Sequence, residues 1–212
     1  MIAKLHYLTQ GNTPQEHLEN VQKACTSGAE LVLLRLNHLS EKKVLKYAEK
    51  AREITAHFQT RLIVQDHYKV AKQIKADGVH LEKSIASTSS VRKHLHTWQL
   101  IGATAYHLED AERLISQELD YLYLGPFQNT NPENNAASLG ITGFSFIQEA
   151  LTTETPLLAF GEISLEGVKA ILGTGVSGLA IDDAITENFN LISAFHDLLQ
   201  ASSTQEKRHT FD

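Results

Sequence analysis

Short apolar runs recur along the chain and alternate with longer segments in which the apolar residues have helical spacing. The runs come at intervals of about 20 to 30 residues, and each has the length of a buried strand rather than of a helix. They predict strands at residues 5–9, 31–36, 61–64, 78–81, 100–104, 121–124, 156–160 and 178–181. Strands that alternate with helices in this way indicate a parallel sheet.

Helix start signals precede several of the intervening segments. Thr13, Pro14 and Glu16 give a cap, a first-turn proline and a capping-box acid in that order, so we expect the first helix to begin near Pro14. Ser40 and Ser164 are the expected caps of two later helices. The first of these two helices has an apolar stripe at helical spacing, which predicts a core-facing side. The stripe consists of Val44, Ala48, Ala51, Ile54 and Phe58.

The number of strands predicts a closed α/β barrel, a single (β/α)8 TIM barrel. A length of 212 residues fits one such domain, which we place at residues 1–201, followed by a polar and flexible tail at 202–212. An open, doubly wound sheet is the alternative, because strand order cannot be read from one sequence. Residues 125–140 form an irregular stretch rich in Asn, Pro and Ser, which is typical of a lid or of a disordered insertion.

Composition and charge narrow the class of partner. The net charge is −6 and the chain has no basic run, so we expect no nucleic-acid partner. No apolar run approaches the roughly 20 residues that span a bilayer, so we expect no membrane partner. Cys25 is the only cysteine, which excludes an internal disulfide, and the first residues do not resemble a signal peptide. The expected compartment is the cytoplasm.

The chemistry of a barrel enzyme lies on the loops that follow its strands. Polar or turn-forming residues stand at or just beyond the end of the predicted strands, except that His80 lies inside the fourth, so we expect them to meet at one mouth of the barrel. They are Gln10, Arg35, Asp66, His80, Thr104, Gly125, Pro126, Gly161, Glu162, Asp182 and Asp183.

Three of these positions allow more than one interpretation. The guanidinium of Arg35, inside the apolar run LVLLRLN, either binds an anionic ligand or forms an internal ion pair with Asp66. Asp66 follows a strand and is a candidate ligand for Mg²⁺. His80 lies in an apolar strand and is either an acid or base or a hydrogen-bonded structural histidine.

Four blocks of the sequence carry a family resemblance. They are GAELVLLRLNHLSE, RLIVQDHYKVAKQIKADGVHLEKS, IGATAYHLEDAER, and DYLYLGPFQNTNP followed by LGITGF. In their order and spacing these blocks resemble the thiamine phosphate synthase and TenI family over residues 3 to about 200. The resemblance implies a transferase that joins hydroxymethylpyrimidine pyrophosphate to thiazole phosphate at the barrel mouth, where Mg²⁺ helps the pyrophosphate to leave.

The resemblance also implies roles for individual residues. Arg35, Asp66 and Thr130 match catalytic positions, and Thr104 conservatively replaces a serine at another. Asp66 also matches a metal ligand. The remaining matched or aligned positions are implied to bind substrate. They are Gln65, His80, Gly125, Pro126, Gly161, Glu162, Asp182 and Asp183.

The sequence departs from the family at several of these positions. The second metal aspartate corresponds to Ser84 or Ile85, so we expect Mg²⁺ to bind weakly, and a lysine of the strand-six loop corresponds to Glu133. The histidine that TenI uses corresponds to Pro126.

Acidic residues replace the neutral phosphate-binding residues that the family has after the last two strands. Glu162, Asp182 and Asp183 stand where the family has small residues that donate backbone N–H groups. If these carboxylates face the mouth, they oppose a bound phosphate. The alternative is that Asp183 caps the last helix and Glu162 points to solvent.

Three functions therefore stay open, all with a small-molecule ligand. The first is a divergent thiamine phosphate synthase of thiamin metabolism. The second is a TenI-like thiazole tautomerase or isomerase, for which His80, His107 or Glu162 would have to serve as acid or base. The third is a non-catalytic barrel that binds a thiamin precursor or another small molecule. The family resemblance also implies a homo-oligomer.

Overall fold

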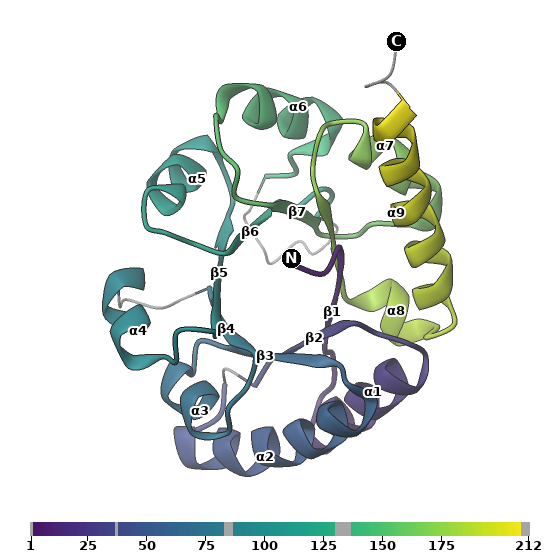
Figure 1. Ribbon diagram of the computed structural model, residues 1–212. Helices are drawn as coiled ribbons and strands as arrows, with labels where there is room; N and C mark the ends of the chain where they lie inside the picture. The colour runs from purple at the N-terminus through teal and green to yellow at the C-terminus, as the bar shows by residue number, and fades with distance from the viewer. Residues whose placement is uncertain (1, 37, 83–86, 130–136, 209–212) are drawn as a thin grey trace.

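Eight parallel strands close into a barrel in the computed structural model, which describes residues 2–36, 38–82, 87–129 and 137–208 (Figure 1). The strands pair in sequence order and β1 pairs with β8, so the open-sheet alternative is wrong. All eight predicted strands are confirmed, with ends that differ by at most two residues. They are β1 (Leu5–Leu8), β2 (Leu31–Leu34), β3 (Arg61–Gln65), β4 (Gly78–Leu81), β5 (Leu100–Ala105), β6 (Tyr121–Leu124), β7 (Leu157–Phe160) and β8 (Gly178–Ile181).

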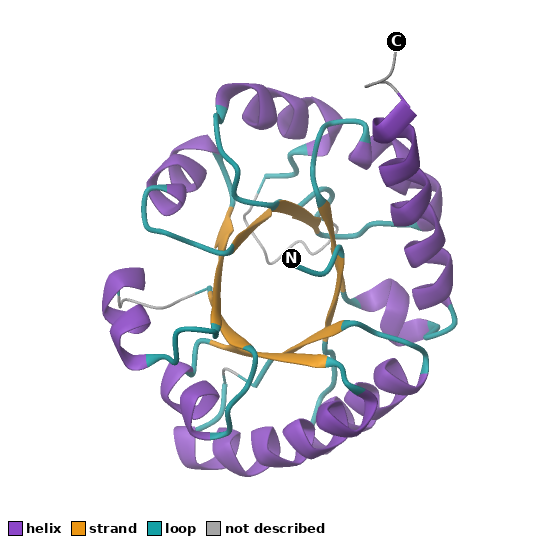
Figure 2. Ribbon diagram, in the orientation of Figure 1, coloured by secondary structure: helices purple, strands orange, loops and turns teal. Residues whose placement is uncertain are grey.

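Helices form an outer ring around the strands (Figure 2). They are α1 (Pro14–Thr26), α2 (Glu41–Phe58), α3 (Tyr68–Gln73), α4 (Thr88–His94), α5 (Leu108–Ile115), α6 (Gly140–Ala150), the 3₁₀ helix η1 (Leu165–Gly167), α7 (Val168–Leu172), α8 (Asp183–Glu187) and α9 (Leu191–Arg208). α1 begins at Pro14 as predicted, and the Thr13 hydroxyl accepts the N–H of Glu16 at 3.2 Å. The Glu16 carboxylate accepts the N–H of Asn12 at 2.7 Å, so it reaches one residue beyond the cap.

The core has two parts, as the barrel architecture requires. The larger part fills the space between the strands and the helices, and the apolar stripe of α2 contributes to it through Val44, Ala48 and Ala51, which are fully buried. Ile54 packs against this core, but Phe58 in the last turn of α2 is 37% exposed. The smaller part lies inside the barrel and is built from aliphatic and tyrosine side chains on alternate strand positions.

Two segments outside the barrel strands were predicted to be irregular. In its described parts, residues 125–129 and 137–139, the first has no helix or strand, as expected. Its two ends are tied together, because the N–H of Leu139 donates to the carbonyl of Pro126 at 2.9 Å and the N–H of Asn129 to the Ser138 hydroxyl at 2.9 Å. The second is the expected tail after residue 201, into which α9 continues as far as Arg208.

Within the described ranges, no helix is long and apolar enough to cross a membrane.

Candidate functional site

A polar cavity of about 270 Å³ lies at the carboxyl ends of the strands. Every strand or the residues directly after it contribute to its lining. Ten of the residues predicted to form the site are among those that line it: Gln10, Arg35, Gln65, His80, Thr104, Pro126, Gly161, Glu162, Asp182 and Asp183. Gly125 and Asp66 do not line the cavity. Thr130, Ser84, Ile85 and Glu133 lie outside the described residues.

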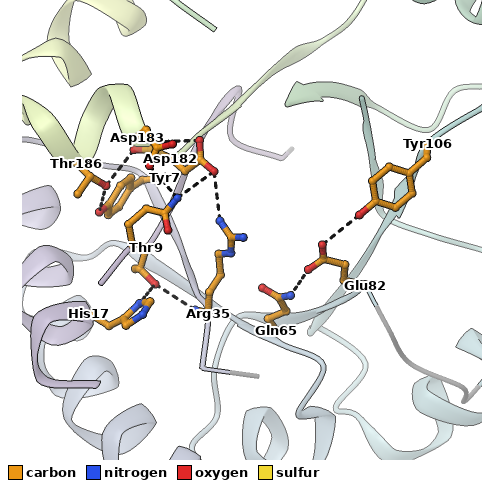
Figure 3. A network of polar contacts seen from close by, with 11 residues as sticks. Tyr7, Thr9, His17, Arg35, Gln65, Glu82, Tyr106, Asp182, Asp183 and Thr186 are labelled. Carbon is orange, nitrogen blue, oxygen red and sulfur yellow. Dashed lines mark hydrogen bonds and ion pairs between the residues drawn. The ribbon is translucent and has the colours of Figure 1, made fainter. Parts of the chain in front are cut away.

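Arg35 contacts an acid that the sequence did not assign to it. Its Nη1 lies 3.3 Å from Oδ2 of Asp182, and the two side chains are 31% and 28% exposed. The interpretation of Arg35 as a partner of Asp66 is therefore replaced by this pair across the cavity mouth (Figure 3). The Gln10 amide joins the same group, because its Nε2 donates to Asp182 at 3.3 Å and to Asp183 at 2.9 Å.

The backbone of Arg35 is also held in place. Its N–H donates to the Thr9 hydroxyl at 3.1 Å, and this hydroxyl lies 2.7 Å from Nδ1 of His17 on α1. Since the Thr9 oxygen accepts from Arg35, its own proton is free to point to the histidine nitrogen. The main chain that carries the guanidinium is thus fixed by β1 and α1.

The two aspartates after β8 both line the cavity, but they make different contacts. Asp182 caps α8, with Oδ1 accepting the N–H of Asp183 at 2.9 Å, so the alternative in which Asp183 is a helix cap is wrong. The Asp183 carboxylate faces the cavity and Gln10, and burial followed by the charge of Asp182 raises its pKa. Glu162 is exposed, but it also lines the cavity.

Asp66 has a structural role at the end of β3. Its backbone adopts a φ of 57°, its N–H donates to the carbonyl of His80 at 2.8 Å, and its Oδ1 accepts the N–H of Glu82 at 2.9 Å. The carboxylate thus fixes the turn after β4 and does not line the cavity. In the part of the chain that the structure describes, no three His, Cys, Asp or Glu side chains are grouped so that they hold a metal ion. These residues do not fit a protein-built Mg²⁺ site at Asp66.

His80 is a buried, neutral histidine in the floor of the cavity. It is 1% exposed, its Nε2 lies 2.8 Å from the Thr104 hydroxyl, and its Nδ1 lies 3.3 Å from the Tyr121 hydroxyl. Its ring stacks on Tyr123 with the centroids 4.2 Å apart. Burial lowers its pKa to about 3, helped by His6 and Arg35. The structural interpretation of His80 therefore accounts for its contacts, and these contacts orient Thr104.

A second interior histidine, His6, was not singled out from the sequence. Its Nε2 lies 3.1 Å from the carbonyl of Ala3, which can only accept, so Nε2 carries the proton and Nδ1 accepts from the Tyr123 hydroxyl at 2.8 Å. Burial lowers its pKa to about 3. The alternation LHYL places His6 on the inner face of β1, but sequence alone does not supply its partner on β6.

Two further cavity residues, Glu82 and Tyr106, were also missed. The Tyr106 hydroxyl donates to Oε1 of Glu82 at 3.2 Å, and Nε2 of Gln65 donates to Oε2 of the same carboxylate (Figure 3). Burial and the Glu82 charge raise the pKa of Tyr106. Glu82 and Tyr106 are the residues directly after β4 and β5, so the rule of strand-following residues applies to both.

The cavity wall after β7 depends on a glycine. Gly161 has a φ of +93°, and a Cβ at this position would lie 2.5 Å from Cβ of Pro126. Only glycine combines this conformation with so close an approach. Gly161 therefore lets the loops after β6 and β7 meet at the cavity.

The charge of the cavity is predominantly negative among its described residues. Arg35 is the one cationic residue of this lining, and it stands against the carboxylates of Glu82, Glu162, Asp182 and Asp183. Because Arg35 already contacts Asp182, a phosphate would have to compete with a carboxylate for the same guanidinium.

A closed β/α barrel with polar groups gathered at the carboxyl ends of its strands is the arrangement typical of barrel enzymes. The family model described as Thiamine monophosphate synthase matches residues 5–185, and the chain belongs to this family. The resemblance predicted from the four sequence blocks is thus confirmed.

Relatives agree with this assignment over most of the chain. The chain is similar to a thiamine-phosphate synthase of Flavobacterium johnsoniae, with 32% identity over 192 residues, which cover 89% of this chain and 91% of the relative. A thiamine-phosphate synthase of Methanococcus maripaludis is 29% identical over 200 residues, 93% of this chain and 95% of the relative. The solved structure of a thiamine phosphate pyrophosphorylase from Pyrococcus furiosus has the same fold, with a TM-score of 0.78, 24% identity and coverage of 95% and 96% of the two chains.

Proposed function

We propose that this protein acts in thiamin metabolism as a divergent thiamine phosphate synthase that binds a thiamin precursor in the barrel-mouth cavity and catalyses the transfer step slowly. Family membership supports the pathway. The observation that carries the divergence is the Arg35–Asp182 ion pair within a cavity lined by four carboxylates.

The transfer reaction explains why this observation matters. The bond between the pyrimidine methylene carbon and the pyrophosphate oxygen breaks, the pyrophosphate leaves with its negative charge, and the thiazole nitrogen attacks the carbon. Stabilisation of the departing polyanion needs positive charge. Arg35 is neutralised in part by Asp182, and the other described acids of the lining repel the leaving group.

We further propose that Mg²⁺ binds this protein weakly in the absence of a phosphorylated ligand. The support is the position of Asp66, whose Oδ1 accepts the N–H of Glu82 and which lies apart from the cavity lining. Hard cations need several oxygen ligands from protein or substrate. Calorimetry checks this: weak heats are expected, and micromolar affinity would contradict the proposal.

The isomerase alternative is less well supported by the histidines. His80 is buried and hydrogen-bonded on both ring nitrogens, and His107 caps α5, where its Nδ1 lies 3.1 Å from the Glu109 carboxylate. His107 is not among the cavity-lining residues. Glu162 stays a candidate acid or base, and the hydrogen-bonded side chains of Glu82 and Tyr106 are further candidates inside the cavity.

Compartment and assembly are part of the same proposal. We propose that the protein is cytoplasmic, which the single, buried and free thiol of Cys25 supports. We also propose that it is a homo-oligomer, which the family resemblance supports. Light scattering on the purified protein measures the assembly. A mass of one chain at micromolar concentration would contradict it.

Genetic complementation tests the proposed function. The gene is expressed at low level in a thiamin auxotroph that lacks its own synthase but makes both precursors, beside an ordinary synthase and an empty vector. We expect slow or no growth at low expression and growth that improves when the protein is overproduced. Full rescue at low expression, with protein levels matched on an immunoblot, would show that the acids do not impair transfer.

A further inference from the structure

A network of polar side chains crosses the barrel interior and ends at the cavity. It consists of His6 on β1, Tyr123 and Tyr121 on β6, His80 on β4 and Thr104 on β5. The histidines and tyrosines are at most 2% exposed, and Thr104 lines the cavity. Because every hydrogen bond needs one donor and one acceptor, the contacts of this interior network determine where each proton lies.

The proton positions follow from the end of the network that is farthest from the cavity. The carbonyl of Ala3 only accepts, so Nε2 of His6, which lies 3.1 Å away, carries a proton. Burial lowers the pKa of His6 to about 3, so the ring is neutral and has no second proton. Its Nδ1 must therefore accept the hydroxyl proton of Tyr123 at 2.8 Å.

Tyr123 has no further proton to donate. A side-chain hydrogen bond joins it to Tyr121, and the centroids of the two rings lie 5.3 Å apart. Since Tyr123 can only accept in this bond, the hydroxyl proton of Tyr121 points to Tyr123. The oxygen of Tyr121 is thereby left as an acceptor for Nδ1 of His80, which lies 3.3 Å away.

His80 connects Tyr121 to the cavity. Burial lowers its pKa to about 3, so the neutral ring has one proton, and this proton lies on Nδ1, toward Tyr121. Its Nε2 has only a lone pair and lies 2.8 Å from the Thr104 hydroxyl. The hydroxyl must donate to this nitrogen, so the Thr104 oxygen has only lone pairs left for a ligand.

We propose that the interior network, beginning at His6, fixes Thr104 as a hydrogen-bond acceptor toward the cavity and thereby determines ligand specificity. An ionised phosphate oxygen also only accepts, so Thr104 cannot donate to it, whereas a ligand group with a proton to donate finds an acceptor. His6 is a positioning residue, because it does not line the cavity and acts through the two tyrosines and His80. The inference deepens the proposed function, on which it rests for the anionic ligand.

NMR of the purified full chain, with heavy nitrogen in its histidine rings, tests the proton positions. Spectra that correlate the ring nitrogens with the carbon-bound ring protons show which nitrogen is protonated. Signals are assigned by their loss in His6→Phe and His80→Gln. At neutral pH we expect the proton of His6 on Nε2 and that of His80 on Nδ1. A His80 proton on Nε2 would overturn the inference, because Thr104 would then be able to donate to a ligand.

Two variants should reverse the direction of the network. In His6→Phe the Tyr123 hydroxyl loses its acceptor and can donate to Tyr121, and in Tyr123→Phe the Tyr121 hydroxyl loses its acceptor. In both variants Tyr121 should donate to Nδ1 of His80, so the histidine proton should move to Nε2. Tyr47→Phe, on α2, removes a hydroxyl outside the network and should leave the protonation of His80 unchanged.

Calorimetry with sodium pyrophosphate measures the consequence in the cavity. His6→Phe should bind pyrophosphate at least about tenfold more tightly than the unaltered protein, because the released Thr104 hydroxyl adds a hydrogen bond to a charged group. Addition of Thr104→Val to His6→Phe should abolish this gain. A gain that persists without the hydroxyl, or a His80 proton that stays on Nδ1 in both folded variants, would overturn the inference.

The NMR measurement separates this inference from the proposed function, because it needs neither ligand nor turnover. Full rescue in the complementation test would contradict the proposed function and leave the proton positions unaffected. A proton on Nε2 of His80 in the unaltered protein would overturn the inference and leave the proposed function to the complementation result. Because the unaltered protein decides this point, the inference stays testable even if His6→Phe and Tyr123→Phe do not fold.

Discussion

Replacement of Asp182 by Asn should increase the affinity of the cavity for pyrophosphate. The substitution removes the carboxylate that lies 3.3 Å from Nη1 of Arg35, so the guanidinium becomes available to an anionic ligand. Asn is as good a helix cap as Asp, and the cap contact that Oδ1 makes with the N–H of Asp183 can be kept. The change is therefore expected to act on charge and to leave the fold intact.

The size of the effect follows from the geometry. Two unit charges about 4 Å apart interact by about 1 kcal/mol in bulk water and by about 4 kcal/mol near a protein surface. The Arg35 and Asp182 side chains are 31% and 28% exposed, and partly exposed ion pairs contribute a net energy of at most about 1 kcal/mol after side-chain ordering and screening, so the smaller value is used for their pair. The substitution also removes the repulsion between the Asp182 carboxylate and a multiply charged ligand, which adds a similar amount to the binding free energy. The sum of about 1–2 kcal/mol corresponds to roughly five- to thirtyfold tighter binding.

Calorimetry with sodium pyrophosphate at low ionic strength measures this gain, with Glu49→Gln as a control that removes the same charge at a distance. Salt should reduce the gain, since ions screen exposed charges. If Asp182→Asn and Glu49→Gln bind pyrophosphate equally, Arg35 is not withheld from anions by Asp182, and the explanation of the divergence is refuted.

Two further predictions concern stability. His6 and His80 have pKa values lowered from 6.5 to about 3, so below pH 6.5 the unfolded chain binds protons that the folded chain excludes. The stability that the two neutral histidines contribute is therefore present above pH 6.5 and is lost as the pH falls toward 3. At pH 5 we expect a loss of about 2 kcal/mol per histidine relative to pH 7, measured by urea unfolding, and a free energy of unfolding that stays constant over this range would contradict it. Gly161→Ala should lower the Tm, because its Cβ would lie 2.5 Å from Cβ of Pro126. Gly28→Ala, at a φ of +89° with no atom within 4 Å, tests the backbone strain alone and should cost less, so an equal loss would refute the steric argument.

The barrel was predictable from sequence because each strand is a short apolar run buried on both faces. The register does not follow from this pattern, because strands that are apolar on both faces show no alternation in the sequence that would fix it. The predicted strand ends also placed two site residues at the mouth, Arg35 at the end of its strand and Asp182 directly after its own. The end of α9 was less predictable, because polar residues after position 201 are compatible with a helix as well as with a tail.

The pairing of site residues was not predictable in the same way. Asp182 is distant from Arg35 in sequence, and only closure of β8 onto β1 brings the two together. Asp66 follows its strand, yet its left-handed backbone directs the carboxylate to the N–H of Glu82 instead of the cavity. Strand ends therefore predict which residues approach the mouth, whereas side-chain direction and partner choice require the three-dimensional structure.

The measurement that most directly tests the account is the rate at which the purified protein forms thiamine phosphate. The assay supplies hydroxymethylpyrimidine pyrophosphate, thiazole phosphate and Mg²⁺, and runs beside an ordinary synthase under the same conditions. Loss of one well-placed transition-state donor costs about 10²- to 10³-fold, so we expect a rate at least about 10²-fold below that of the standard. Turnover equal to the standard would contradict the account, because it would mean that the ion pair of Arg35 and the acids around it leave the transfer step unaffected.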